Sequence, residues 1–145
     1  MKIVIGGDHR GYPLKEMLVE YLQNLGHDVA DVGTHSGESV DYPEYAGKVA
    51  EKVVQGAADK GVLICGSGIG VCMAANKYRG IRAANVINAD QARLARSHND
   101  ANVMCIGANY VDFAEAKKMI DDYIKTVFEG GRHERRIEQI KGIES

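Results

Sequence analysis

The sequence predicts an α/β fold built on a parallel β-sheet, and two patterns carry that prediction. Short β-branched runs alternate with amphipathic segments along the whole chain, which is typical of repeated strand–helix units. The amphipathic segments place apolar residues three and four positions apart, the spacing of one helix face. No linker, internal repeat or low-complexity segment interrupts the alternation, so we expect a single domain over residues 1–145.

Five strands are expected, at 2–6, 28–32, 61–65, 82–87 and 103–107. In an open parallel sheet, ligands bind beyond the carboxyl ends of the strands. The loops that follow those ends are 7–10, 33–35, 66–70, 88–90 and 108–109. Polar residues and glycines are concentrated in the first and third of these loops, which makes them the best candidates for a site.

The first expected helix starts near Pro13 and stops at Gly26. Its apolar stripe consists of Leu14, Met17, Leu18, Tyr21, Leu22 and Leu25. Pro43 opens a second helix, whose inner face is Ala46, Val49, Ala50 and Val53. A longer helix ended by Gly130-Gly131 carries Phe113, Ala116, Ile120, Ile124 and Val127. Shorter helices are expected after Gly70, near 90–97 and at about 132–142.

Composition narrows the classes of function. The formal net charge is −2, and the basic residues are spread along the chain apart from Arg132, Arg135 and Arg136, so nucleic acid is not an expected partner. No apolar run approaches the ~20 residues that span a bilayer, and no start resembles a signal peptide, so we expect a soluble, cytoplasmic protein without membrane contact. The three cysteines form no CxxC pair, which agrees with reduced thiols.

The stretch LICGSGIG, residues 63–70, is the most informative segment. Glycines after a strand let backbone N–H groups converge, which suits an anion or a developing oxyanion, although such glycines also serve tight turns and packing. Cys65 is either a nucleophile or base, or a small buried residue. The spacing excludes the P-loop, the dinucleotide fingerprint and, around Ser67, the GxSxG elbow. A thiol phosphatase would need arginine where this chain has Val71.

Several other polar residues are open to two interpretations. His9 and His98 lie among polar neighbours, which favours function about as much as packing. Arg132 and Arg136 are one helical turn apart, so they either grip a phosphate or form a solvated helix start. No histidine or cysteine pairing has metal-ligand spacing, so no metal site is expected.

Six motifs occur in order from the first strand to the last helix. They are GDHRGYPLK at 7–15, SVDYPEYA at 39–46, LICGSGIGVCMAANK at 63–77, GIRAA at 80–84, ARSHNDANV at 95–103 and EGGRHERRI at 129–137. Together they resemble the ribose-5-phosphate isomerase B family, which also includes galactose- and allose-6-phosphate isomerases. The resemblance covers essentially the whole chain.

The resemblance implies a Rossmann-like, three-layer fold with a five-stranded parallel sheet flanked by helices. It implies interconversion of D-ribose 5-phosphate and D-ribulose 5-phosphate through a cis-enediolate, without a cofactor or a metal. The partners it implies are a small sugar phosphate and further copies of the chain, in a homodimer or a dimer of dimers with active sites at the subunit interface. The C-terminal helix, at about 132–142, is then expected to pack across that interface.

The family pattern also implies roles for residues of the third loop. Cys65 matches the catalytic base, which takes a proton from carbon. The developing negative charge is received by the backbone of Gly66, Gly68, Ile69 and Gly70. Ser67 stands where many members have threonine, and either hydroxyl could contact the substrate or relay protons.

Further roles fall on residues outside that loop. His98 matches the residue that opens the sugar ring, with Asn99 and Asp8 as polar neighbours. Tyr42 is expected to line the sugar pocket. The phosphate is expected to contact His9, Arg132 and Arg136, partly across the dimer interface.

Two positions depart from the family pattern and leave the substrate open. Many members carry an arginine at the phosphate after the fifth strand, where this chain has Asn109. Arg10, where many members have a small residue, is the candidate to compensate. A six-carbon substrate, allose 6-phosphate or galactose 6-phosphate, is therefore an alternative. A noncatalytic sugar-phosphate-binding module is a further alternative, and it would have no use for Cys65 and His98.

Overall fold

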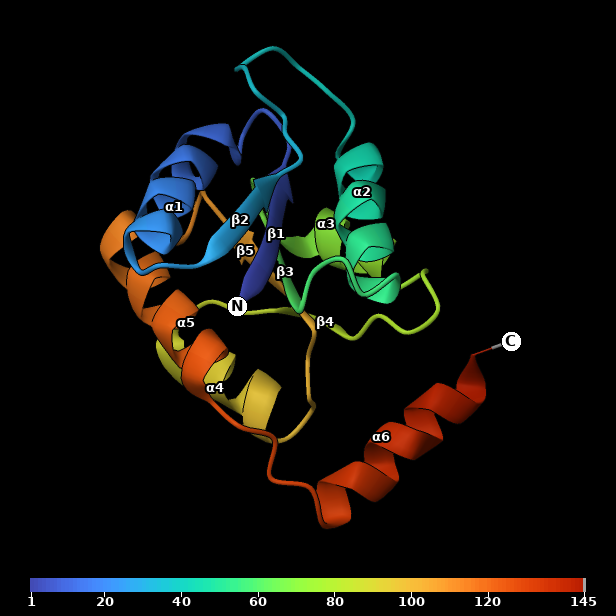
Figure 1. Cartoon of the computed structure of the whole chain (residues 1–145). Helices are drawn as coiled ribbons and strands as arrows, with labels where there is room; N and C mark the ends of the chain where they lie inside the picture. The colour runs from blue at the N-terminus through green and yellow to red at the C-terminus, as the bar shows by residue number, and fades with distance from the viewer. Residues whose placement is uncertain (145) are drawn as a thin grey trace.

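The computed structural model describes residues 1–144, in which five strands alternate with the first four of six helices and the last two helices follow β5 (Figure 1). The strands are β1 (Lys2–Gly7), β2 (Asp28–Asp31), β3 (Lys60–Cys65), β4 (Ala83–Asn85) and β5 (Val103–Gly107). The helices are α1 (Tyr12–Asn24), α2 (Tyr42–Val54), α3 (Ile69–Ala75), α4 (Ala89–Ser97), α5 (Phe113–Lys125) and α6 (Arg132–Ile143). The expected α/β class is confirmed.

All five strands are parallel and lie in the order β2-β1-β3-β5-β4. From β1 the chain moves outward to β2, and it then returns to the other side of β1 as β3. The strand order therefore reverses between β1 and β3, and the loops after these two strands diverge at their carboxyl ends. A crevice at such a reversal is the usual ligand site of open α/β sheets.

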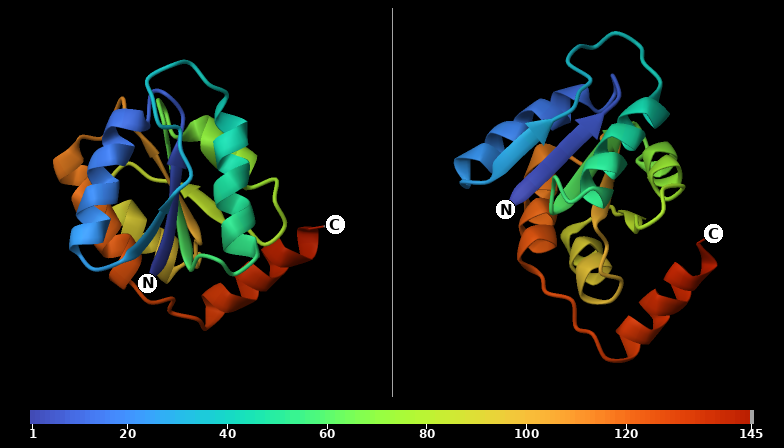
Figure 2. Two further views of the ribbon diagram at one scale, coloured as in Figure 1. Left: turned by 45° about the horizontal axis from the view of Figure 1, so that its top comes forward. Right: turned by 45° about the vertical axis from the view of Figure 1, so that its right-hand side comes forward.

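Successive side chains of each strand point to opposite faces of the sheet, and a hydrophobic core forms on each face. Odd and even neighbours point to opposite faces, so Ile64 packs in the layer of α1, α4 and α5, while Leu63 and Cys65 pack in the layer of α2 and α3. Figure 2 shows these helices on either side of the sheet. The short apolar strands are thus buried on both faces, as parallel sheets require.

The boundaries of several elements differ from the expectation. The strand expected at 82–87 covers only Ala83–Asn85. Before it begins, the Arg82 N–H donates to the Asn102 side chain and the Arg82 guanidinium donates to the Asp100 carbonyl. Helix α5 stops at Lys125, since Thr126 is extended, and Val127 is therefore exposed. In the first helix the stripe is narrower than expected: Leu14, Leu18 and Leu22 are buried, whereas Met17 and Leu25 are exposed.

Helix α6 lies at the margin of the molecule, beyond the layers that enclose the sheet (Figures 1 and 2). Its buried residues are His133 and Ile137, while Ile140 and Ile143 are exposed. The helix therefore presents much of its apolar surface outward. None of the described helices combines the length and apolarity needed to cross a membrane.

Candidate active site

A cavity of about 510 Å³ opens at the carboxyl ends of β1, β3 and β5. Its lining combines the loop after β1, the turn after β3, the starts of α2 and α3, and the loop after β5. The lining residues are Asp8, Arg10, Tyr42, Cys65, Gly66, Ser67, Ile69, Gly70, Met73 and Asn109. Nine of these ten were expected at the site from sequence, and they come together because parallel strands end at one edge of the sheet.

Cys65 is the last residue of β3, and its sulfur faces the turn that follows. The Gly68 N–H donates to Cys65 Sγ at 3.1 Å, a contact that stabilises negative charge on the sulfur. The Ile69 N–H donates to Ser67 Oγ at 3.1 Å, which leaves the Ser67 hydroxyl proton free for another acceptor. Within residues 1–144, the N–H groups of Gly66 and Ser67 donate to no acceptor. The loop therefore offers a sulfur and free donors side by side.

The glycines of this loop answer specific steric demands. Gly68 has φ +77°, and a Cβ there would lie 2.9 Å from the backbone nitrogen of Gly107 on the neighbouring strand. A Cβ on Gly70 would lie 2.6 Å from the ring of Tyr42, which packs directly over that position. The absence of side chains is thus required for the close approach of β5 and Tyr42 to the turn.

The loop after β1 is held by its own acidic residue. Asp8 is buried, and its Oδ1 accepts the N–H groups of Arg10 and Gly11, both at 3.0 Å. His9 does not line the cavity; its Nδ1 accepts the Val40 N–H at 3.2 Å, which assigns the proton of the neutral ring to Nε2. Asp8 therefore shapes the loop that presents Arg10 to the cavity.

Arg10 and Asn109 approach the same spot from two loops. A Cβ placed on Gly66 would meet Arg10 Cδ at 3.0 Å and Asn109 Nδ2 at 3.1 Å. No carboxylate of residues 1–144 lies within ion-pair distance of the Arg10 guanidinium, which is exposed. The cavity thus holds one cation and one amide that are free to contact a ligand.

Four residues expected at the site lie near the amino ends of the strands, at the end of the sheet opposite Cys65. His98 caps the carboxyl end of α4, Asn99 follows it, and Arg132 and Arg136 lie on α6. Cys65 pairs with Gly107 at the end of β5, whereas His98 precedes the start of that strand. About 13 Å of strand, at ~3.3 Å per residue, therefore separates them. A single copy of the chain does not bring these residues to the Cys65 cavity.

His133 stacks on His98 near the amino ends of the strands, with ring centroids 4.3 Å apart and an angle of 11° between the ring planes. Burial is the largest cause that lowers the pKa of His133, and the nearby charges of His98 and Arg132 lower this pKa further. His133 was missed in the sequence analysis, because nothing in its spacing from His98 indicates that the two rings meet.

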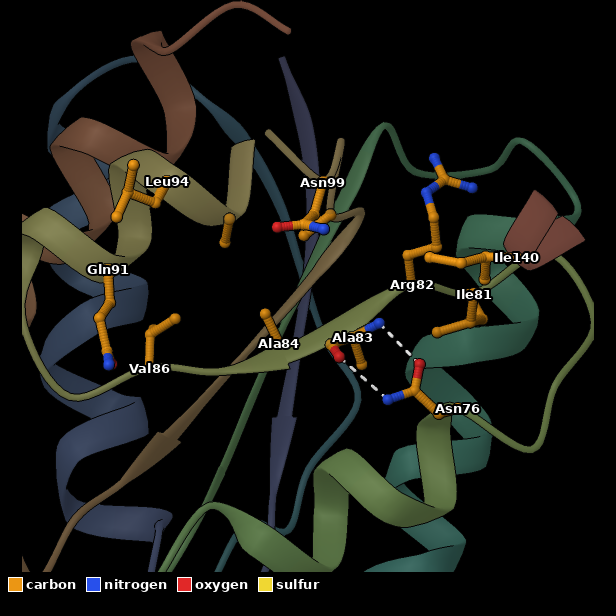
Figure 3. A pocket seen from close by; sticks show the side chains of 12 residues that line it. Asn76, Ile81, Arg82, Ala83, Ala84, Val86, Gln91, Leu94, Asn99 and Ile140 are labelled. Atoms are coloured by element: carbon orange, nitrogen blue, oxygen red, sulfur yellow. Dashed lines mark hydrogen bonds between the residues drawn. The ribbon is translucent and has the colours of Figure 1, made fainter. Parts of the chain in front are cut away.

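A second cavity, of about 380 Å³, lies beside the edge strand β4 (Figure 3). Leu94 and Ala95 of α4 line one side, Ile140 of α6 lines another, and Asn99 also faces it. The Asn76 side chain pairs with both backbone groups of Ala83, at 2.9 and 2.8 Å, as the dashed lines in Figure 3 indicate. This pairing satisfies part of the open strand edge.

Two further residues near the site were not expected to have a role. Met73 lines the Cys65 cavity and is 64% exposed; its spacing of four from Ile69 is the signal that places both on one helix face. Cys72, on the same helix, is only partly buried. The Cys105 thiol and the Asn85 backbone lower the pKa of Cys72 to about 7, against the opposing effect of burial.

Comparison with known proteins gives a consistent result. The model of the ribose/galactose isomerase family matches residues 3–140. Ribose-5-phosphate isomerase B of Escherichia coli is 46% identical over 143 residues, covering 99% of this chain and 96% of that protein.

Two solved structures extend the likeness to three dimensions. Ribose-5-phosphate isomerase B of Clostridium thermocellum has a TM-score of 0.98 and 48% identity, covering 99% of this chain and 97% of that one. The Mycoplasma genitalium enzyme of the same name, solved with bound ribulose-5-phosphate, has a TM-score of 0.95 and 45% identity. Its match covers 99% of this chain and 95% of that one.

Proposed function

The chain belongs to the ribose/galactose isomerase family, and we propose that it interconverts D-ribose 5-phosphate and D-ribulose 5-phosphate as an aldose–ketose isomerase. The observation that carries the proposal is the position of Cys65, whose sulfur faces a turn with free N–H donors inside the cavity. The reaction needs these two parts together, a base for carbon and donors for the oxygen that becomes negative.

In the proposed mechanism, the Cys65 thiolate removes the proton from C2 of the open-chain aldose. The C–H electron pair forms the C1=C2 bond of a cis-enediolate, and the carbonyl electrons move onto oxygen. The free N–H groups of Gly66 and Ser67, within the loop 66–70, stabilise that oxyanion. The Ser67 hydroxyl relays a proton between the substrate oxygens: it gives its own proton to the negative O1 and takes the proton of the C2 hydroxyl, so that C2=O can form. Cys65 then returns its proton to C1, which completes the ketose.

Substrate position is set by groups that do not react. Tyr42 and Ile69 contact the sugar carbons, while Asp8 shapes the loop that carries Arg10. Arg10 and Asn109 reach the substrate from the chain that holds Cys65. His9 lies just beyond the cavity, and its Nε2–H is available to a phosphate oxygen. Binding the remote phosphate holds the reacting carbons against the base.

A second copy of the chain supplies the remaining groups in this proposal. His98 and Asn99 open the sugar ring, and Arg132 and Arg136 bind the phosphate, in each case from the copy that does not hold the reacting Cys65. Their distance from Cys65 within one chain supports this arrangement. The helix at about 132–142 packs against the second copy, which covers the exposed side chains of Ile140 and Ile143.

The proposal includes neither a cofactor nor a metal in catalysis, and a cytoplasmic location. The reaction moves a proton within one molecule, so electrons and atoms balance without a further reactant. The free thiols of Cys65, Cys72 and Cys105 support a reducing compartment.

The test is a comparison of kcat/KM for ribose 5-phosphate, allose 6-phosphate and galactose 6-phosphate, with wild type and Cys65→Ala. We expect the highest value for ribose 5-phosphate. Cys65→Ala should lower kcat by about 10²–10⁴-fold, the usual contribution of a general base, while substrate binding measured by calorimetry is kept. A higher value for a six-carbon substrate would reassign the substrate. Binding without turnover in the wild type would indicate a noncatalytic module, and full activity of Cys65→Ala would refute the assigned base.

A further inference from the structure

His133 of α6 covers one face of the His98 ring. The ring centroids lie 4.3 Å apart and the angle between the ring planes is 11°, so the two imidazoles are stacked face to face. The His98 side chain is 39% exposed, whereas the His133 side chain is 11% exposed. The stack therefore covers part of the His98 ring and leaves the rest of that ring open to a substrate.

No hydrogen bond among residues 1–144 holds a nitrogen of the His98 ring. The Glu129 carboxylate is beside it, but Oε2 lies 3.8 Å from His98 Nε2, which is too far for a hydrogen bond. The Glu129 side chain is also 55% exposed. A histidine that transfers protons is normally held in one orientation by a second group. In this chain the stacked ring of His133 can hold the His98 ring.

Contacts that do not involve the His98 ring fix the position of His133. The Glu129 N–H donates to the carbonyl of Ser97 at 3.0 Å, which ties the segment before α6 to the residue that precedes His98. Ile137, one helical turn after His133, is 3% exposed, so both side chains lie on the face of α6 that packs against the rest of the chain. His133 is thus a fixed support for a ring at the end of α4.

The same stack links the proposed ring-opening residue to the proposed phosphate ligands. Arg132 and Arg136 flank His133 on α6, whereas His98 lies at the carboxyl end of α4. Contact between the two imidazoles therefore sets the position of the His98 ring relative to both arginines. In the proposed function, these groups act at the two ends of one sugar phosphate.

The charge of His133 also suits this support. Burial is the largest cause that lowers its pKa below the ordinary value of about 6.5; His98, Arg132 and Arg136 lower this pKa further, and Glu129 opposes the change. A lowered pKa means that the ring loses its proton at a lower pH, so His133 is neutral at neutral pH. The His98 ring can then gain a proton without facing a second cation in the stack.

We propose that His133 is a positioning residue for isomerisation, whose ring holds the His98 ring in the orientation that opens the sugar. In ring opening, His98 takes the proton of the C1 hydroxyl, and the O–H electron pair forms C1=O. The bond between C1 and the ring oxygen breaks, and His98 passes the proton to that oxygen. His133 acts through His98 and does not touch the substrate, so this inference rests on the proposed function.

The first test compares His133→Leu with His133→Phe in the full-length protein. Both side chains are apolar, but only phenylalanine offers a flat ring that can stack on His98. For ribose 5-phosphate, we expect kcat to fall about tenfold in His133→Leu and to stay within about threefold of wild type in His133→Phe. KM should change by less than about threefold in both, because the arginines stay on α6. Equal kcat in the two variants would overturn the proposal, since docking of α6 needs only apolar bulk.

The second test makes His133→Leu in a chain that already carries His98→Asn, with residual turnover measured at high enzyme concentration. Because His133 acts through His98, we expect kcat to fall by less than about twofold further. A further loss as large as in the wild-type background would mean that His133 acts independently of His98. That result would also overturn the proposal.

Proton NMR tests the stack without turnover. The ring protons of His98 are identified by their absence from the spectrum of His98→Asn. We expect the stacked ring to shift them upfield in the wild type and in His133→Phe, but not in His133→Leu. Identical His98 shifts in all three proteins contradict this inference alone. A stack that is present in a chain without turnover of any sugar phosphate contradicts the proposed function, so the two failures are distinguishable.

Discussion

At the scale of single residues, position within the secondary structure decides how each of the three thiols behaves. Cys105 lies inside β5 and is completely buried, and this burial raises its pKa well above the ordinary value. Cys72 lies on α3, partly buried, with its pKa lowered to about 7. Cys65 ends β3, so its sulfur lines the cavity and receives an N–H. Only the thiol at the strand end is placed to reach a substrate.

Cys72 should be a second reactive thiol. In the Cys65→Ser chain, we expect iodoacetamide to label Cys72 with a rate that is half-maximal near pH 7. Below this pH the sulfur is a thiol and reacts slowly, and above it the sulfur is a thiolate and reacts fast. Peptide mass spectrometry across a pH series measures the rate. Cys72→Ala in the same background is the control, and a midpoint at the ordinary cysteine value of about 8.5 would contradict the assignment.

Arg10 should contribute to recognition of the phosphate. Replacing it with alanine removes the free cation beside Asn109, and we expect KM for ribose 5-phosphate to rise about 10- to 100-fold, the range for a lost hydrogen bond to a charged group. Steady-state kinetics should show a much smaller effect on kcat. Arg10→Lys keeps the charge and should recover part of the loss. An unchanged KM in Arg10→Ala would remove Arg10 from phosphate binding.

At the scale of elements, the turn between β3 and α3 couples the sheet to the site. β5 approaches this turn so closely that Gly107 must also lack a side chain, because a Cβ there would meet the carbonyl of Ser67. The carbonyls of Cys65 and Gly66 accept the N–H groups of Ala108 and Asn109, at 2.9 and 3.0 Å. The loops after β3 and β5 therefore form one unit, and a change in either displaces the free donors.

Gly68→Ala should damage both this unit and catalysis. The positive φ and the 2.9 Å approach to Gly107 together cost about 1–3 kcal/mol of unfolding free energy, the range for a strained backbone position. The Gly68 N–H would also move away from Cys65, so kcat should fall as well. Chemical denaturation and kinetics measure the two effects. Gly37→Ala, at an open position, is the matched control, and equal behaviour of both variants would exclude the steric argument.

At the scale of the whole molecule, the parts of the proposed site lie at opposite ends of one chain. Cys65 lies at the carboxyl ends of the strands, whereas His98, Arg132 and Arg136 lie toward the amino ends. Helix α6 projects beyond the layers with exposed apolar residues (Figure 1). An assembly of two copies related by a two-fold axis would join one end of each copy to the other end of its partner.

Mixing two inactive variants should test this arrangement. In the proposed dimer, Cys65→Ala and His98→Asn each disable both sites when every chain carries the change. In a mixed dimer, one site combines both defects and the other has neither. Random pairing makes half of the dimers mixed, so we expect about a quarter of wild-type activity after joint refolding. Each variant refolded alone is the control. Activity no greater than the sum of the two controls would mean that both residues act within one chain.

Much of the fold follows from local sequence pattern, and the errors are informative. The strands at 2–6, 61–65 and 103–107 were predicted to within one residue, because buried parallel strands are short apolar runs between turn residues. The strand at 82–87 was predicted too long at both ends; at its start, Arg82 contacts Asp100 and Asn102, about 20 positions away, before the strand begins. Exposure of Met17 and Leu25 likewise depends on which part of α1 the sheet covers.

The sequence by itself determined the α/β class, the glycine turn after Cys65 and nine of the residues that line the cavity. Each of these features depends on residues that are close together in the sequence. Parallel strands bring their carboxyl ends to the same end of the sheet, whatever the order of the strands. Only the tertiary structure decided that His98 and the arginines of α6 lie near the amino ends of the strands, and that His98 meets both Glu129 and His133. Such contacts join segments about 30 residues apart in the sequence. The packing of whole helices and strands sets their distances, and no local sequence pattern indicates that packing.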